Sequence, residues 1–126
     1  MNIGIIATED KMLQLENFCT AYRRMLSKHK IYTIDGMGDK FNKLLNTKMV
    51  ICLPVNLGGI NQFVTKIREN GIDIVFFFKG KMENIIENNQ LSEVLDVCND
   101  YTIPIATNMA TAEILILGLD RGDLSW

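Results

Sequence analysis

The sequence predicts an α/β domain in three layers, with a five-stranded parallel sheet covered by helices on both faces. Segments with apolar residues at helical spacing alternate with short, nearly continuous apolar runs, which occupy residues 3–7, 31–34, 49–53, 72–78 and 103–106. Strands that alternate with helices form parallel sheets, and a strand covered on both faces reads as a continuous apolar run. Glycine and proline stand between the two kinds of segment, where turns are expected.

The first two strands are each followed by a helical pattern. After residues 3–7, Thr8 supplies a hydroxyl that can cap a helix, and Glu9 and Asp10 supply the acids that a helix N-terminus favours. Helical spacing then continues to about residue 27. The second run, 31–34, ends at a glycine-rich segment, and apolar residues at 41, 44 and 45 predict a short helix.

The remaining three strands follow the same order. The run 49–53 meets Pro54, passes Gly58 and Gly59, and opens into an amphipathic helix that we expect to end at a left-handed Gly71. Residues 72–78 are the most apolar run, which predicts a central strand. Helical patterns over 84–98 and 110–119 flank the fifth strand, near whose start Pro104 is tolerated.

Length and charge limit the class of protein. The chain has 126 residues, which predicts one domain spanning residues 1–126. Its formal net charge is −2, and lysine and arginine form no basic stripe, so we expect no nucleic acid partner. The N-terminus has no signal-peptide pattern, and no apolar run approaches about 18 residues, so we expect a cytoplasmic protein without membrane contact.

Cysteine and histidine give no sign of a metal or nucleophile site. Cys19, Cys52 and Cys98 fall within apolar patterns, which predicts small core side chains rather than a redox pair or zinc ligands. His29, the single histidine, follows the first helix between two lysines, where a cation is ordinary. The sequence therefore predicts no metal site and no Ser-His-Asp or Cys-His arrangement.

Any small-molecule site should lie at the carboxyl ends of the parallel strands. We predict ligand-binding residues at these ends: Glu9, Lys11, Asp35, Gly36, Gly38, Gly58, Gly59, Lys79, Asn108 and Thr111. Glycine-rich turns between a strand and a helix can present N–H groups to an anion, although they also occur for purely steric reasons. Asp35 beside one such turn would repel phosphate unless a cation intervened.

For several polar residues at these strand ends, a purely structural role remains an alternative to ligand binding. Glu9, Asp10 and Lys11 can act as acid, base or charge partner, or can serve the dipole of the first helix. Lys79 and Lys81 can bind a ligand oxygen or be solvated. Asn108 and Thr111 can face a ligand over the sheet, or Thr107 or Asn108 can cap the last helix.

The chain resembles the methylglyoxal synthase family over essentially its whole length. The segments that carry the resemblance are Phe-Cys-Thr-Ala-Tyr-Arg at 18–23, Leu-Gly-Gly at 57–59, Ile-Pro-Ile-Ala-Thr-Asn-Met-Ala-Thr-Ala-Glu-Ile-Leu at 103–115 and Leu-Asp at 119–120. The resemblance implies a Rossmann-like fold and a homo-oligomer, which is a hexamer in the family's enzymes. Those enzymes convert dihydroxyacetone phosphate to methylglyoxal and phosphate without metal or cofactor. The same fold class binds ligands without catalysis in carbamoyl-phosphate synthetases.

The resemblance also implies which positions should carry the chemistry, and the sequence departs from the family there. The family's catalytic base, an aspartate after the paired glycines, falls on Ile60, and its acid after the fourth strand falls on Gly80. Its His-Asp pair after the first strand falls on Thr8 and Glu9, and its carbonyl-polarising histidine falls on Glu87. Its phosphate-binding lysine falls on residue 12, its Thr-Gly-Thr-Thr-Gly phosphate loop on residues 34–38, and its Ser-Gly pair on residues 54–55.

We therefore expect a family member that has lost catalysis and binds a small molecule or partner at the strand ends. Two alternatives remain. One is an active, rewired phospho-lyase with Glu9 or Glu87 as base and Lys11, Lys79 or Lys81 holding phosphate. The other is a structural subunit of a homo-oligomer or of an assembly with an active paralogue.

Overall fold

The structure is a computed structural model that describes residues 1–36, 45, 48–54, 57–81 and 85–123 and, within the last helix but one, the side chains of residues 89 and 92–100. This part of the chain contains five strands and six helical segments. Their order is β1 (Asn2–Ala7), η1 (Glu9–Lys11), α1 (Met12–Ala21), α2 (Arg23–Leu26), β2 (Lys30–Ile34), β3 (Met49–Cys52), α4 (Gly59–Arg68), β4 (Ile74–Phe78), α5 (Ile85–Asp100), β5 (Ile105–Ala106) and α6 (Met109–Arg121).

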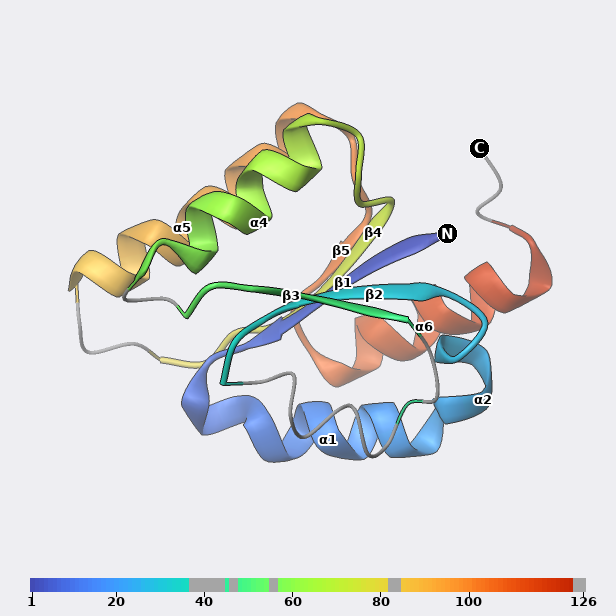
Figure 1. Cartoon of the computed structure of the whole chain (residues 1–126). Coiled ribbons are helices and arrows are strands. Elements are labelled where there is room, and N and C mark those ends of the chain that lie inside the picture. Colours follow the sequence, from blue (N-terminus) through green and yellow to red (C-terminus); the bar gives the residue numbers. More distant parts are fainter. Residues whose placement is uncertain (37–44, 46–47, 55–56, 82–84, 124–126) are drawn as a thin grey trace.

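The five strands form one parallel sheet, which confirms the predicted fold class (Figure 1). Their spatial order is β3-β2-β1-β4-β5, so β1 lies in the middle and pairs through Ile3 with both Ile31 of β2 and Ile74 of β4. The chain builds outward from β1 through β2 to β3, and then returns to the other side of β1 with β4. The strand order therefore reverses between β1 and β4. Open α/β sheets bind ligands at such a switch point.

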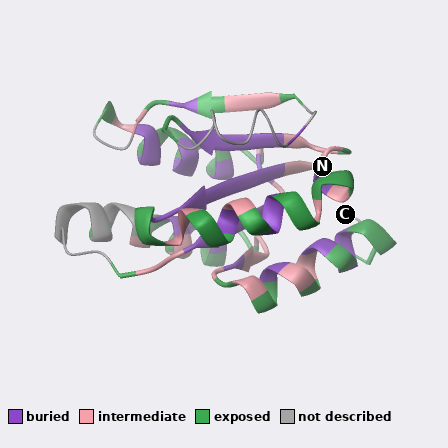
Figure 2. Cartoon of the chain, turned by 90° about the horizontal axis from the view of Figure 1, so that it is seen from below, coloured by how far each residue is buried: buried purple, intermediate pink, exposed green. Residues whose placement is uncertain are grey.

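Helices cover both faces of the sheet. In Figure 1, α4 and α5 lie above the sheet, and α1, α2 and α6 lie below it. Alternate residues of each strand point to opposite faces, so β4 gives Phe76 and Phe78 to the lower core and Val75 and Phe77 to the upper core. Figure 2 shows the inner strands buried between helices whose outer faces are exposed, whereas the edge strand β3 is only partly buried.

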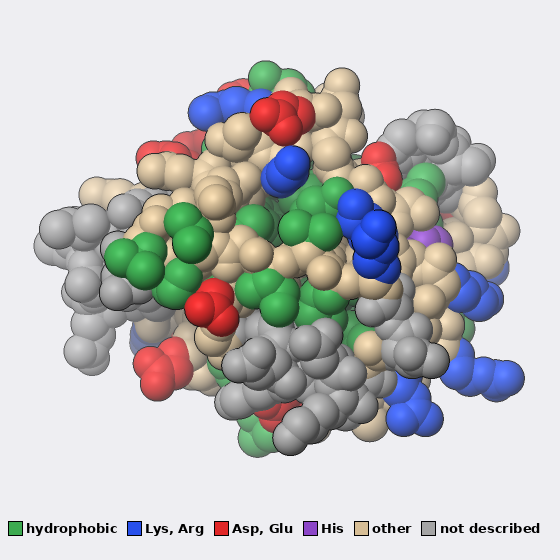
Figure 3. Space-filling model, viewed as in Figure 1, with side chains coloured by type: hydrophobic (Ala, Val, Ile, Leu, Met, Phe, Trp, Pro, Cys, Tyr) green, Lys and Arg blue, Asp and Glu red, His purple; other side chains and the backbone are tan. Residues whose placement is uncertain are grey.

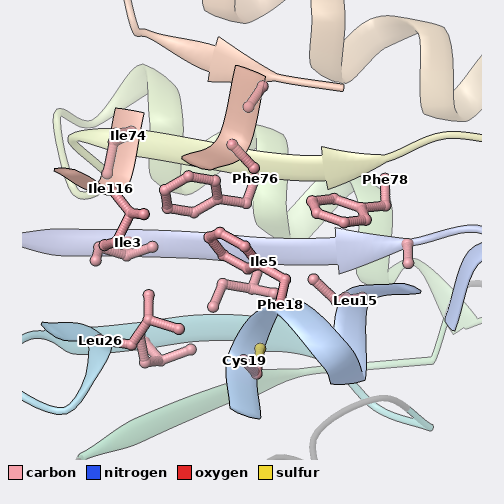
Figure 4. Close-up of a cluster of buried hydrophobic side chains, with 14 of the residues drawn as sticks. Ile3, Ile5, Leu15, Phe18, Cys19, Leu26, Ile74, Phe76, Phe78 and Ile116 are labelled. Carbon is pink, nitrogen blue, oxygen red and sulfur yellow. The ribbon is translucent and has the colours of Figure 1, made fainter. Parts of the chain in front are cut away.

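Aromatic packing fills the lower core. Phe18 of α1 lies with its ring centroid 5.0 Å from that of Phe76 and 5.6 Å from that of Phe78 (Figure 4). Such tilted rings add attraction beyond the area that they bury. Tyr22, at the end of α1, has its ring 5.3 Å from Phe18 and donates a hydrogen bond of 2.8 Å from its hydroxyl to Glu113 of α6. This pair ties together the two helices that cover the lower face.

The predicted first helix differs from the structure at both ends. Thr8 does not cap the helix, because its hydroxyl accepts from the N–H of Gly80 and donates to Asp10 instead. Residues 9–11 form a 3₁₀ turn before α1. The regular helix stops at Ala21, and the chain leaves helical geometry at Tyr22 before resuming in α2. The expected cap at Thr8 and the single helix to residue 27 are therefore wrong.

The prediction that Gly71 is left-handed is also wrong. Asn70 has a φ of 59° after α4, and the N–H of Gly71 then donates to the carbonyl of Lys66 at 2.8 Å. Asparagine tolerates this conformation, so glycine is not required there. The later elements agree with expectation, except that β5 is shorter than predicted. Of the short helix expected at 41–45, only Leu45 belongs to the described residues, and it is buried.

Thr102 is the one β-branched residue with positive φ among the described residues, at 56°, and it ends α5 in the same way as Asn70 ends α4. A β-branched side chain in this region is strained, and left-handed backbone costs non-glycine residues about 1–2 kcal/mol. We expect Thr102→Gly to raise the free energy of unfolding by about 0.5–1 kcal/mol, after allowing for the greater freedom of glycine in the unfolded chain. Urea denaturation measures this, and Asn70→Gly is the matched control with a smaller expected gain. Equal gains in both variants would contradict the assigned strain.

Candidate functional site

The predicted site residues gather at the carboxyl ends of the strands, on the left of Figure 1 where α1 and α4 begin. Glu9 and Lys11 follow β1, Asp35 and Gly36 follow β2, and Lys79 follows β4. Gly58 and Gly59 precede α4, and Asn108 and Thr111 stand at the start of α6. Gly38 lies outside the described residues. The fold therefore places the described members of the predicted set at one end of the sheet.

The loops after β1 and β4 are joined by a closed set of hydrogen bonds. The Thr8 hydroxyl donates to Oδ1 of Asp10 at 2.6 Å and accepts from the backbone N–H of Gly80 at 2.8 Å. The other carboxylate oxygen of Asp10, Oδ2, accepts from the N–H of Lys81 at 3.3 Å. The Thr8 N–H also donates to the carbonyl of Phe78 at 3.0 Å, which extends the pairing of β1 with β4 by one residue.

Asp10 and Gly80 fit together because residue 80 has no side chain. A Cβ added to Gly80 would overlap the carboxylate of Asp10, so the acid occupies the space where a side chain at position 80 would begin. The hydrogen bond from Thr8 holds the pKa of the Asp10 carboxyl below its usual value. Asp10 therefore places a charged carboxylate between the carboxyl ends of β1 and β4 at neutral pH.

Sequence reasoning missed this cluster. Thr8 was expected to cap the first helix, Asp10 was expected to serve the helix dipole or to act as acid, base or charge partner, and no contact between either residue and Gly80 was predicted. The pattern of the sequence gives no signal for the contact, because it joins residues about seventy positions apart. Only the pairing of β1 with β4 brings them together.

The described charges at the ends of β1 and β4 are mixed. Glu9 and Asp10 are exposed, Lys81 is exposed, and Lys11 and Lys79 are half-buried. The structure brings the predicted residues Glu9, Lys11 and Lys79 to one place, as expected. No described pair among these groups forms a salt bridge, and the Asp10 carboxylate is held by hydrogen bonds from the Thr8 hydroxyl and the Lys81 N–H.

The paired glycines have steric roles. Gly58 has a φ of 94°, a conformation that side chains rarely adopt, and a Cβ added to Gly59 would overlap the carbonyl oxygen of Leu53. The N–H of Gly59 donates to the carbonyl of Pro54 at 3.0 Å, so this N–H is already satisfied within the loop. Gln62 completes the loop, since its Oε1 accepts from the N–H of Leu53 at 2.6 Å. These bonds support the steric alternative over an anion cradle at this N–H.

Ile60 is part of the upper core. Its side chain is 2% exposed and belongs to the apolar cluster that includes Ile34, Cys52 and Phe63. It lies in the first turn of α4, directly after the glycines. A buried aliphatic side chain at this place can neither accept a proton nor contact a solvent-borne ligand.

The ends of β2 and β5 also use their polar groups internally. The Asp35 carboxylate accepts from the N–H of Gly36 at 3.0 Å, and Gly36 has a φ of 92°. Asn108 caps α6, because its Oδ1 accepts from the N–H of Thr111 at 3.1 Å and lies 3.3 Å from the Thr111 hydroxyl. The capping interpretation of Asn108 is thus confirmed, and both residues remain exposed at the same end of the sheet.

The three thiols are buried, as predicted. Burial raises the pKa of Cys19 and of Cys98 to about 12, and burial also raises the pKa of Cys52. A thiol in this state is a poor nucleophile. Among the described residues, no three His, Cys, Asp or Glu side chains are grouped so as to hold a metal ion.

Two hollows lined by described residues lie away from the strand ends. One runs between β3 and α4 and is lined by Val50, Ile51 and Gln62 among others. Figure 3 shows hydrophobic side chains gathered at the middle of this face, where β3 forms the edge of the sheet. The other lies at the opposite end of the sheet, beside Asp73 and Tyr101. The side chain of Glu87, a candidate base in the rewired alternative, lies outside the described set.

No described helix is long and apolar enough to cross a membrane.

No protein-family model matches the chain. The chain is similar along its whole length to the methylglyoxal synthase of Alkaliphilus metalliredigens, with 36% identity over 126 residues, 100% of this chain and 94% of that protein. It is 38% identical over 126 residues to the methylglyoxal synthase of Caldicellulosiruptor saccharolyticus, covering 100% of this chain and 89% of that protein. The crystal structure of methylglyoxal synthase from Elizabethkingia anophelis shares the fold, with a TM-score of 0.77 at 23% identity over 91% of this chain and 76% of that one.

Proposed function

This chain belongs to the methylglyoxal synthase family, and we propose that it is a member without synthase activity that binds a small molecule at the carboxyl ends of β1 and β4. The family's reaction requires a base beside the substrate carbonyl, an electrophile near its oxygen and donors for its phosphate. Each of these roles is missing from the position to which the resemblance assigns it.

Ile60 is the observation that carries the proposal. The resemblance assigns the proton-abstracting aspartate to this position, and here the side chain is aliphatic and 2% exposed. Gly80 and Thr8 stand where the resemblance assigns an acid and a histidine. Loss of one such group typically lowers the rate by orders of magnitude, so the loss of all of them together leaves no efficient path to methylglyoxal.

The retained architecture supports ligand binding. The strand order reverses between β1 and β4, and the crevice outside such a switch point is where open α/β sheets hold ligands. Glu9, Asp10 and Lys81 are exposed at this place, and the hydrogen bonds between the two loops fix its backbone. A fixed, polar and accessible surface costs little to organise when a ligand binds.

The second candidate is an active synthase with relocated groups. It is favoured by the full-length identity of 36% and 38% to proteins named methylglyoxal synthase, and by the carboxylate that Asp10 supplies beside Gly80. In this candidate Glu9 or Glu87 is the base, and Lys11, Lys79 or Lys81 holds the phosphate. Its mechanism would still abstract the proton beside the carbonyl and expel phosphate.

An enzyme assay decides between the two. We expect purified chain to form methylglyoxal from dihydroxyacetone phosphate no faster than buffer, while an active family member assayed in parallel forms it rapidly. Rapid formation by this chain would contradict the proposal. Glu9→Gln and Glu87→Gln would then identify the base, and unchanged activity in both variants would remove the rewired mechanism as stated here.

Assembly and location are part of the same proposal. We propose a cytoplasmic homo-oligomer that needs no cofactor, with the hexamer of the family's enzymes as the reference state. Exposed apolar side chains support association: Ile114 and Leu117 of α6 are 70% and 39% exposed, and Leu13 of α1 is 69% exposed. Size measurement of the chain alone, and mixed with an active family member, tests both this assembly and the structural-subunit alternative.

A further inference from the structure

We propose that the hollow at the amino ends of β4 and β5 binds a small organic cation that carries a planar, guanidinium-like group on an apolar body. The hollow has a volume of about 560 Å³, within the range of about 300–1,000 Å³ that is usual for small-molecule sites. It lies at the end of the sheet opposite to the candidate site described above, so this proposal does not rest on the proposed function. Its carboxylate, its aromatic side chain and its apolar lining together select the ligand.

The hollow is formed by two neighbouring connections of the chain. Its lining consists of Asn70, Ile72 and Asp73 between α4 and β4, and of Tyr101, Thr102, Ile103 and Pro104 between α5 and β5. The pairing of β4 with β5 brings these connections together, and the N–H of Val75 donates to the carbonyl of Pro104 at 2.9 Å. The backbone around the hollow is therefore held in place by the sheet.

Asp73 is the one charged side chain that lines the hollow. Its Oδ2 accepts from the backbone N–H of Asn2 at 2.8 Å, and its own N–H donates to the Asn2 carbonyl at 2.8 Å. Among the described residues, none donates to the other carboxylate oxygen, Oδ1. The half-buried carboxylate is thus fixed by one oxygen while the other can accept from a ligand, and a cationic donor gives the stronger, charge-assisted hydrogen bond.

The surroundings of Asp73 favour a positive charge. No lysine or arginine lines the hollow, and Asp73 forms no salt bridge with a described residue. The nearby Lys66 pairs with Glu69 at 3.8 Å, and the Met1 ammonium lies 3.1 Å from Nδ1 of His29. In Figure 1, α4 and α5 end at the same side of the molecule, where the chain turns down into β4 and β5. The carbonyl groups at helix C-terminal ends carry partial negative charge, which also attracts a cation.

The remaining lining favours an organic cation over a metal ion. Tyr101 is 43% exposed, and an aromatic ring at the surface attracts a cation. Planar guanidinium-like groups can both stack on such a ring and bond to a carboxylate. Ile72 is fully buried, and Ile103 and Pro104 are half-buried, so they offer contact to an apolar body. A divalent metal ion gains nothing from these side chains and needs more oxygen ligands than one carboxylate supplies.

The test compares benzamidine with benzamide and benzoate, which share the aromatic ring and differ in charge. Each compound is titrated into the ¹⁵N-labelled chain, and the amide signals of Asp73, Thr102 and Ile103 are followed. We expect benzamidine to shift these signals with about millimolar affinity, benzamide to bind about tenfold more weakly, and benzoate to leave the signals unchanged. The amide signals of Gly36 and Gly80, at the other end of the sheet, should not respond. No shift with benzamidine, or equal affinity for benzamidine and benzamide, would overturn the proposal.

Asp73→Asn tests the charge, because it keeps the shape of the side chain and an oxygen that can accept from Asn2. We expect this variant to bind benzamidine about tenfold more weakly and to bind benzamide as the wild type does. Asp100→Asn is the matched control, since it removes an exposed carboxylate at the end of α5 that does not line the hollow. Its affinity for benzamidine should change by less than about twofold. An effect of Asp100→Asn as large as that of Asp73→Asn would overturn the proposal.

Tyr101 provides a second test that does not depend on the folding of the Asp73 variant, because its side chain is exposed. Tyr101→Ser removes the ring and should weaken benzamidine binding by about two- to fivefold, whereas Tyr101→Phe keeps the ring and should retain the affinity. Benzamidine affinity equal to that of the wild type in both Asp73→Asn and Tyr101→Ser would overturn the assignment of the hollow as a cation site.

Discussion

Gly59→Ala is expected to lower the free energy of unfolding by about 3 kcal/mol or more, one of the largest single-methyl effects available in this chain. The added Cβ would overlap the carbonyl oxygen of Leu53, which belongs to the backbone and cannot rotate away as a side chain could. The loop would have to open, and it would lose the bond from the Gly59 N–H to Pro54. The bond from Leu53 to Gln62 depends on the same approach.

Gly58→Ala is the matched control for this prediction. Gly58 has a φ of 94°, so alanine is strained there, but nothing lies within 4 Å of its added Cβ. Its expected cost is therefore about 1–2 kcal/mol, that of the left-handed backbone alone. Urea denaturation of both variants measures the difference. A Gly58 variant as unstable as the Gly59 variant would show that backbone conformation, and not the contact with Leu53, makes the pair of glycines necessary.

Ile60→Asp is expected to destabilise the chain by about 3–5 kcal/mol at neutral pH and to give no methylglyoxal. The side chain is 2% exposed and lies in the cluster with Ile34 and Phe63, so an aspartate there would be an unpaired charge in an apolar core. Restoring the acid that the resemblance assigns to this position therefore removes stability without restoring the reaction. The other catalytic positions stay substituted.

The pH dependence identifies the cause of the loss. Burial in apolar surroundings raises the pKa of an aspartate above its unfolded value of about 3.9, so the folded variant binds more protons than the unfolded one between these two values. Its stability must then fall as pH rises through that window. Unfolding at pH 4 and pH 7 measures the change. Ile60→Val, at an expected cost of about 0.5–1.5 kcal/mol, should show no such dependence beyond that of the wild type.

Only the position of the candidate site was predictable from the sequence. Parallel strands from alternating segments place every strand's carboxyl end at one edge, so Glu9, Lys11, Asp35 and Lys79 were expected together and are found together. The roles were less predictable. Asn108 caps α6, and Gly58 and Gly59 are required by backbone conformation and close packing. These roles depend on hydrogen-bond partners and neighbouring atoms that a sequence pattern does not identify.

The conformations and hydrogen bonds of the turns were also not predictable from the sequence pattern. A glycine after a helical segment usually marks its left-handed end, yet α4 uses Asn70 and α5 uses Thr102. Thr8 was expected to cap a helix, since its hydroxyl precedes two acids, but it bonds to Asp10 and Gly80 instead. For Thr8, the contact with Gly80 on another loop selected the observed arrangement.

By itself the sequence determined the fold class, the order of the strands and helices along the chain, and the apolar residue at position 60. Periodicity and composition are local properties of the sequence, and they identify buried parallel strands clearly because such strands are continuous apolar runs. The tertiary structure alone decided that β4 lies beside β1, that the Asp10 carboxylate fills the space above Gly80, and that Ile60 is in the core. These facts depend on contacts between residues far apart in the chain, where only the folded backbone fixes the distance.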